Sequence, residues 1–152
     1  MKTKNLTATL LLAFAFTGIT QAHEGVELGP NGGRILEFSD NETMHGEVTA
    51  KDGQFHIAVL DKDLKPVAIK AQHLTATSGD RANPAKLDVT VKDDAFVVPM
   101  MKGEDFWVIF QFQENDSADK VTARLHYNAE NCSGCDSPEW LCKCKDDQED
   151  KK

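Results

Sequence analysis

Cysteine is absent from the first 131 residues of this chain, and all four cysteines lie between positions 132 and 144. A domain that precedes them must fold without a disulfide and without a cysteine-bound metal ion. The antibody type of β-sandwich, in which a disulfide joins the two sheets, is excluded for the same reason. The cysteines therefore form one local unit near the end of the chain.

Long apolar runs are also lacking, except at the very start. Met1 to Asn5 is short and basic, Leu6 to Thr20 is mostly apolar, and Thr20-Gln21-Ala22 places small residues before a cleavage point. This order is typical of a secretory signal peptide. We expect residues 1–22 to be removed, leaving a periplasmic or secreted protein with no membrane span after cleavage.

Positive charge is scarce. The chain has 17 Lys and Arg against 25 Asp and Glu, and loss of Lys2 and Lys4 with the signal peptide leaves 15 against 25, a net charge of about −10 over 130 residues. Such a surface makes nucleic acid an improbable partner. No nucleophile–base constellation, glycine-rich phosphate loop or paired-carboxylate motif is found, so we expect a protein that is not an enzyme.

Short alternating apolar stretches recur between turn signals up to residue 127, and no convincing helical pattern occurs before residue 130. This spacing predicts an all-β fold: an antiparallel two-layer β-sandwich, immunoglobulin-like, of eight or nine short strands, with a small barrel as the alternative. The sandwich should occupy residues 23–128, and a cysteine-rich, acidic tail residues 129–152. The expected strands cover residues 34–38, 44–51, 55–59, 67–77 (one or two strands), 87–91, 96–98, 106–112 and 121–127.

A strong turn signal, Asp52-Gly53, stands between two of these stretches and predicts a two-residue hairpin. The turn sets the register, so that Val48 should lie opposite Ile57 with both facing the core. His45 and His56 should then be solvated on the outward face, about 13 Å apart along the ladder and too far apart to share an ion. The same alternation places three residues of this strand on the outward face: His45, Glu47 and Thr49.

The cysteines have the spacing C-x2-C-x6-C-x-C, from Cys132 and Cys135 to Cys142 and Cys144. Four thiolates at short spacing suit a tetrahedral zinc ion, and soft Cu(I) also favours sulfur. The alternative is a pair of disulfides that link the first arm to the second, because a Cys142–Cys144 ring would be strained. A redox pair is a thinner third interpretation, since no thioredoxin-like βαβ context surrounds the C-x2-C motif.

Other residues could assist such a site. After cleavage, His23 would carry a free α-amine beside its imidazole, a ready chelate for Cu(II). His126 lies on the last expected strand, near the cysteine arms. Met100 and Met101 are expected to pack at the core or its rim. Trp140 is expected to pack against the sandwich and so dock the cysteine unit.

Several motifs resemble a known family. They are Gly29-Pro30-Asn31-Gly32-Gly33-Arg34-Ile35, the segment Glu47 to Ala50, and Ala58-Val59-Leu60-Asp61 followed by Lys65-Pro66-Val67. Over residues 29–127 the chain resembles the small β-sandwich domain found with periplasmic adaptor subunits of heavy-metal efflux systems. It lacks the coiled-coil and lipoyl-like segments of a full adaptor, so the resemblance implies a free-standing relative with a metal-efflux or envelope protein as partner.

Two classes of function follow. The first is an exported metal-binding protein that handles copper or zinc through Cys132, Cys135, Cys142 and Cys144, assisted by His126 or His23. The second is a non-catalytic periplasmic interaction or accessory domain with a disulfide-stapled tail. The oxidising compartment favours the second class, because unprotected thiol pairs are oxidised there.

Overall fold

The computed structural model describes residues 26–79 and 83–144, so the expected signal peptide, His23 and the acidic end of the tail lie outside the described residues. Nine strands and one short 3-10 helix make up its regular structure. Within these ranges no helix is long and apolar enough to span a bilayer. The elements are β1 (Arg34–Glu37), β2 (Met44–Lys51), β3 (Gln54–Asp61), β4 (His73–Ser78), β5 (Ala85–Leu87), β6 (Thr90–Lys92), β7 (Ala95–Pro99), β8 (Asp105–Gln113), β9 (Val121–Asn128) and η1 (Glu139–Leu141).

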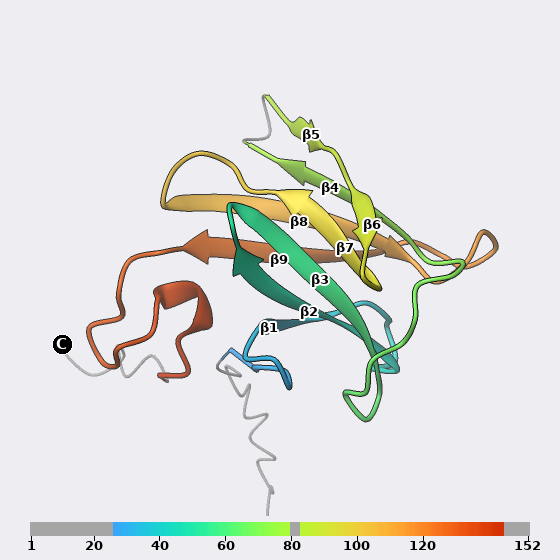
Figure 1. Cartoon of the computed structure of the whole chain (residues 1–152), viewed down its shortest axis with the longest axis horizontal. Helices are drawn as coiled ribbons and strands as arrows, with labels where there is room; N and C mark the ends of the chain where they lie inside the picture. Colours follow the sequence, from blue (N-terminus) through green and yellow to red (C-terminus); the bar gives the residue numbers. More distant parts are fainter. Residues whose placement is uncertain (1–25, 80–82, 145–152) are drawn as a thin grey trace, which may run out of the picture.

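The strands form two antiparallel sheets, with the orders β1-β2-β3-β7-β6 and β5-β4-β8-β9. The two sheets overlap in the view of Figure 1, and the last described part of the chain, drawn in red, loops beside one end of them. Alternating residues of both sheets build one core, in which Val48, Ile57 and Phe110 are fully buried. The predicted all-β, two-layer antiparallel sandwich is therefore confirmed.

The β2–β3 hairpin has the expected register. Val48 pairs with Ile57, and Ala50 pairs with Phe55. Asp52 and Gly53 have φ angles of 51° and 72°. Two successive positive φ values are what a type I′ turn requires, and this turn matches the twist of the two strands. Turn chemistry and apolar alternation thus specify the same pairing.

The outward face of β2 is covered, which corrects the expectation for Glu47. Its side chain is 1% exposed. Oε1 accepts hydrogen bonds from the backbone N–H groups of Asn31 (2.6 Å) and Gly33 (3.0 Å), and Oε2 accepts one from Asn31 Nδ2 (2.8 Å). A Cβ on Gly29 would lie only 2.6 Å from the Glu47 carboxyl carbon, so glycine lets this lead-in approach the sheet. Strand alternation could not reveal a loop that covers the outer face.

His45 is also buried, at 8% exposure, and is not the solvated surface histidine that alternation predicted. Its Nδ1 lies 3.1 Å from Glu37 Oε2 on the neighbouring strand. On its other side it pairs with Leu60, which is itself fully buried. Strands pair with β2 on both sides at this position, so His45 has a neighbour on each side. His56 is only half-buried, and no group of potential metal ligands in the described residues contains either histidine.

Two expected strands differ in the structure. In the stretch 67–77 the only regular strand is β4. Val67, after the turn that follows β3, donates its N–H to Val59 O at 2.8 Å. The stretch 87–91 divides between sheets: β5 pairs with β4, whereas β6 pairs with β7 in the opposite sheet. Apolar alternation continues through such a crossing, because it records which residues are buried and not which strand they pair with.

The strand β8 lies inside its sheet, between β4 and β9, and it has apolar side chains on both faces, which is typical of a central strand. Its outward side chains are nevertheless uncovered, since Trp107 is 52% and Ile109 38% exposed. Met100 is partly buried and packs against the core, in line with its expected role at the rim.

Candidate metal centre

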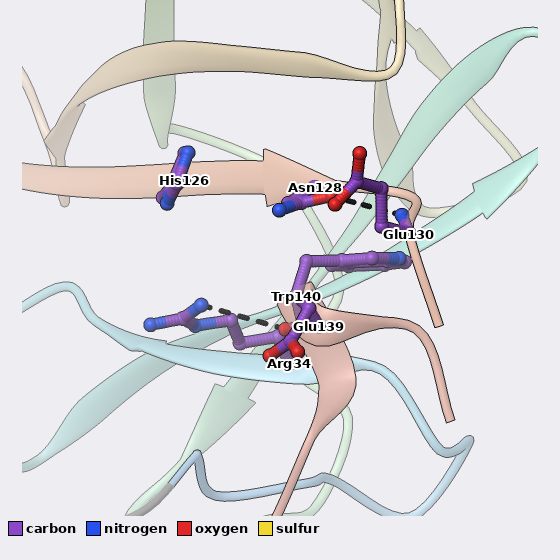
Figure 2. Close-up of a pocket in the computed structure, with 6 residues that line it drawn as sticks. All are labelled: Arg34, His126, Asn128, Glu130, Glu139 and Trp140. Atoms are coloured by element: carbon purple, nitrogen blue, oxygen red, sulfur yellow. Dashed lines mark hydrogen bonds between the residues drawn. The ribbon is translucent and has the colours of Figure 1, made fainter. Parts of the chain in front are cut away.

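Trp140 attaches the C-terminal segment to the sandwich. It is 5% exposed and belongs to the core, with ring centroids 6.3 Å from Phe55 and 5.4 Å from Tyr127. Its carbonyl oxygen accepts a hydrogen bond from Arg34 Nη1 at 3.4 Å. Figure 2 shows the indole lying between β9 and the Arg34 side chain of β1. The predicted packing of Trp140 against the sandwich is confirmed.

The chain before Trp140 folds back on itself. Asn131 and Pro138 form an isolated antiparallel bridge, and Cys132 N–H donates to Ser137 O at 2.9 Å. The short helix η1 follows at once and ends where Cys142 N–H donates to Glu139 O at 3.1 Å. This turn brings the C-x2-C arm against the C-x-C arm. Because Trp140 lies in η1, the cluster is held close to the sandwich.

The four cysteines meet as one unit. Their Sγ atoms all lie within 4.8 Å of one another, and all four thiols are free. Cys142 Sγ is 3.0 Å from Cys132 Sγ and 3.7 Å from Cys135 Sγ. In a tetrahedral site with metal–sulfur bonds of about 2.3 Å, neighbouring sulfurs are about 3.8 Å apart. The arrangement is thus close to that of four thiolates around one ion, and small side-chain movements would complete it.

Backbone amides point at three of the four sulfurs. The N–H of Gly134 donates to Cys132 Sγ at 3.4 Å, and that of Cys144 donates to Cys142 Sγ at 3.3 Å. Cys135 accepts a hydrogen bond from the N–H of Ser137. Each donor is two residues beyond its cysteine. Such bonds stabilise the thiolate form, which is the form that binds a metal ion.

The pKa values of the thiols are shifted in different directions. The Ser137 N–H, followed by contacts with the other thiols, lowers the pKa of Cys135 to about 7. The pKa of Cys142 is raised to about 12, chiefly because its S–H is donated to Cys132. The pKa of Cys144 is also raised, chiefly by its hydrogen bond with Cys135. The Cys135 thiolate is thus surrounded by thiols that keep their protons. Binding of a metal ion would release those protons.

His126, expected as an assisting ligand, belongs to a different group of side chains. Its Nε2 lies 2.7 Å from Asp105 Oδ1, and its ring stacks on Trp107 with centroids 4.4 Å apart. The four-sulfur group contains no histidine from the described residues. A ligand role for His126 stays a prediction, and His23 lies outside the described residues.

His126 lines a pocket of about 230 Å³, and no cysteine lines this pocket. In Figure 2, His126 and Asn128 of β9 lie on one side, and Arg34, Glu139 and Trp140 lie on the other. Two carboxylates, one guanidinium and one imidazole face the pocket. Its lining consists of Arg34, His126, Asn128, Glu130, Glu139 and Trp140.

Sequence reasoning missed the residues that support the cysteines. Arg34 was assigned only to a strand, although it caps the Trp140 carbonyl 106 positions along the chain. The spacing of the cysteines did not identify Gly134 as an amide donor to Cys132. The C-x2-C spacing was the one local signal for such amide donors. In this motif the backbone turns around the first sulfur, so that the following N–H groups can point at it.

Comparison with models of protein families, with curated proteins and with solved structures found no match. The likeness to the adaptor-associated sandwich domain therefore stays a prediction from the motifs alone. The cysteine cluster itself is then the feature of the molecule that bears on function.

Proposed function

We propose that this protein is an exported binding protein for a soft metal ion, zinc or copper(I), held by Cys132, Cys135, Cys142 and Cys144. One observation carries the proposal: four sulfurs from two arms of the chain converge within 4.8 Å of one another. Thiolate sets of this kind select zinc and copper(I) over hard cations such as magnesium or calcium. The amide N–H groups at three of the sulfurs support the same chemistry, because they stabilise negative charge.

The setting of the site is part of the proposal. The basic and apolar start of the chain supports export to the periplasm or the exterior. The motifs at residues 29–35 and 58–67 support an association with envelope metal efflux. We assign the protein a role in holding metal and no catalytic reaction.

A second candidate is favoured by the contact between Cys142 and Cys132. Their sulfurs lie only 3.0 Å apart, on different arms of the segment. Oxidation would link these arms with little rearrangement, and the cluster would then act as a staple for an interaction domain. The two candidates predict opposite states of the same four sulfurs, so one measurement separates them.

The deciding experiment uses the mature protein from the exported fraction, purified without reductant or added metal. Native mass spectrometry gives the bound metal, and alkylation after denaturation gives the number of free thiols. One bound ion with four free thiols supports the metal site. A mass lower by about 4 Da than the reduced chain, with no metal, supports two disulfides and contradicts it.

Matched variants connect the ion to the cluster. Cys142→Ser should remove the ion, because Cys142 contacts both Cys132 and Cys135. His73→Gln is the control, since this imidazole pairs with Asp116 on the β4–β8 sheet and lies outside the four-sulfur group. Loss of metal in both variants would point to non-specific binding and would contradict the assignment.

A further inference from the structure

The four sulfurs differ in how far the protein covers them. Cys142 is buried, Cys132 and Cys135 are intermediate, and Cys144 is exposed. Cys142 also follows directly on η1, which Trp140 anchors in the core. The cluster therefore has a closed side against the sandwich and an open side at Cys144.

Gly134 keeps the open side accessible. A Cβ at this position would lie 3.1 Å from Cys144 Sγ and 3.9 Å from Cys132 Sγ, so any side chain would press on the exposed sulfur. The backbone here does not demand glycine, because Gly134 is not among the glycines with positive φ. The absence of a side chain thus matters for access to the sulfur and not for the turn.

Structural zinc sites are closed in the sense that four protein ligands fill the coordination sphere. An exposed corner is useful when the ion must be handed on. Water or an incoming ligand can occupy the position of Cys144 while the three better-covered sulfurs still hold the ion. Loss of the buried Cys142 has no such compensation.

Resting on the proposed function, we propose that the cluster is a transfer site, and that its ion enters and leaves by exchange at Cys144 with a thiol-bearing acceptor. The incoming sulfur forms a bond to the metal, and the bond from the metal to Cys144 breaks. Further acceptor sulfurs then replace Cys132, Cys135 and Cys142 one at a time in the same way, and the ion leaves bound to the acceptor. The metal keeps its oxidation state. The proton that the incoming thiol loses balances the proton that the released Cys144 thiolate takes up.

The test follows zinc from the loaded full-length mature protein to dithiothreitol, a small dithiol, under anaerobic conditions. The rate of transfer should rise in proportion to the dithiol concentration, because the acceptor attacks the bound ion. Gly134→Ala should slow the transfer about tenfold, and Ser133→Ala, its neighbour, should leave the rate unchanged. Equilibrium titration should show zinc bound in both variants.

Equilibrium affinities give a second, independent measurement. Cys144→Ser should weaken zinc binding about tenfold, whereas Cys142→Ser should weaken it about a hundredfold or more. Equal losses would overturn the inference, as would a transfer rate that ignores the dithiol concentration. If the unaltered protein binds no zinc or copper(I) at all, the proposed function fails, which is a different outcome from tight binding without exchange.

Discussion

The sandwich and the cysteine segment of residues 129–144 are stabilised in different ways. The sandwich has two continuous hydrogen-bonded sheets and a core of large, fully buried side chains, including Phe55 and Phe110. The cysteine segment has one deeply buried aromatic residue, Trp140, a few backbone bonds and four sulfurs. A segment this short cannot bury enough apolar surface to offset the entropy of ordering it. Its order must therefore depend on its attachment to the sandwich and on what the sulfurs bind.

The largest effect is expected in the sandwich core. Phe110 on β8 is fully buried, so Phe110→Ala should lower the free energy of unfolding by about 3–5 kcal/mol through lost burial and a residual cavity. Ile109→Ala, one residue away on the outward side at 38% exposure, should change it by less than about 1 kcal/mol. Urea unfolding followed by circular dichroism measures both. Equal losses would mean that β8 does not present the faces described.

A smaller effect should follow from removing the cysteine segment. A chain of residues 23–128 loses the contacts of Trp140 with Phe55 and Tyr127, which should lower stability by about 3 kcal/mol. The remaining strands keep both sheets, so the shortened chain should still show a β-type spectrum and a cooperative melt. Trp140→Ala in the full chain is the control and should give a similar loss. An unfolded spectrum for the shortened chain would show that the two regions fold as one.

Glu47 tests whether the sandwich, too, depends on a polar attachment. Glu47→Gln replaces one carboxylate oxygen with an NH2 group, which cannot accept a hydrogen bond from Asn31. The change should lower the free energy of unfolding by about 1–2 kcal/mol. Glu114→Gln, at an exposed position directly after β8, is the matched control and should have little effect. Loss of protection of the Asn31 and Gly33 amides from hydrogen exchange would place the effect in the lead-in. An unchanged midpoint would contradict the role given to this carboxylate.

The smallest effect concerns thiol protonation in the metal-free, reduced cluster. The pKa of Cys135 is about 7 because Ser137 N–H stabilises its thiolate. The folded state therefore favours this thiolate, and the stabilisation is lost as the pH falls through 7. Alkylation of Cys135, followed by peptide mass mapping, should rise through pH 7 and then level off. Cys142, with a pKa raised to about 12, should stay slow over the same range.

Denaturation supplies the control for this titration. In urea the local hydrogen bonds are lost, so all four thiols should react with one profile near the ordinary pKa of about 8.5. A Cys135 profile that is the same in the folded and unfolded chain would contradict the amide contact as its cause.

Much of the sandwich could be predicted because its determinants are local. Asp52-Gly53 and the flanking alternation specify the β2–β3 register without reference to the rest of the chain. The apolar side chains on both faces of β8 are likewise a local signal of an inner strand. The prediction failed where a distant segment intervened, as with Glu47, which alternation placed in water and the glycine-rich lead-in covers.

For the cysteines, the sequence by itself determined that they form one unit, because their short spacing leaves them few places to go. Only the tertiary structure decided how that unit is oriented. Trp140 packs in the core and Arg34 caps its carbonyl, so Cys142 is turned toward the protein and Cys144 toward solvent. Spacing limits which sulfurs can meet, whereas burial depends on contacts between residues about a hundred positions apart, and no local pattern records those contacts.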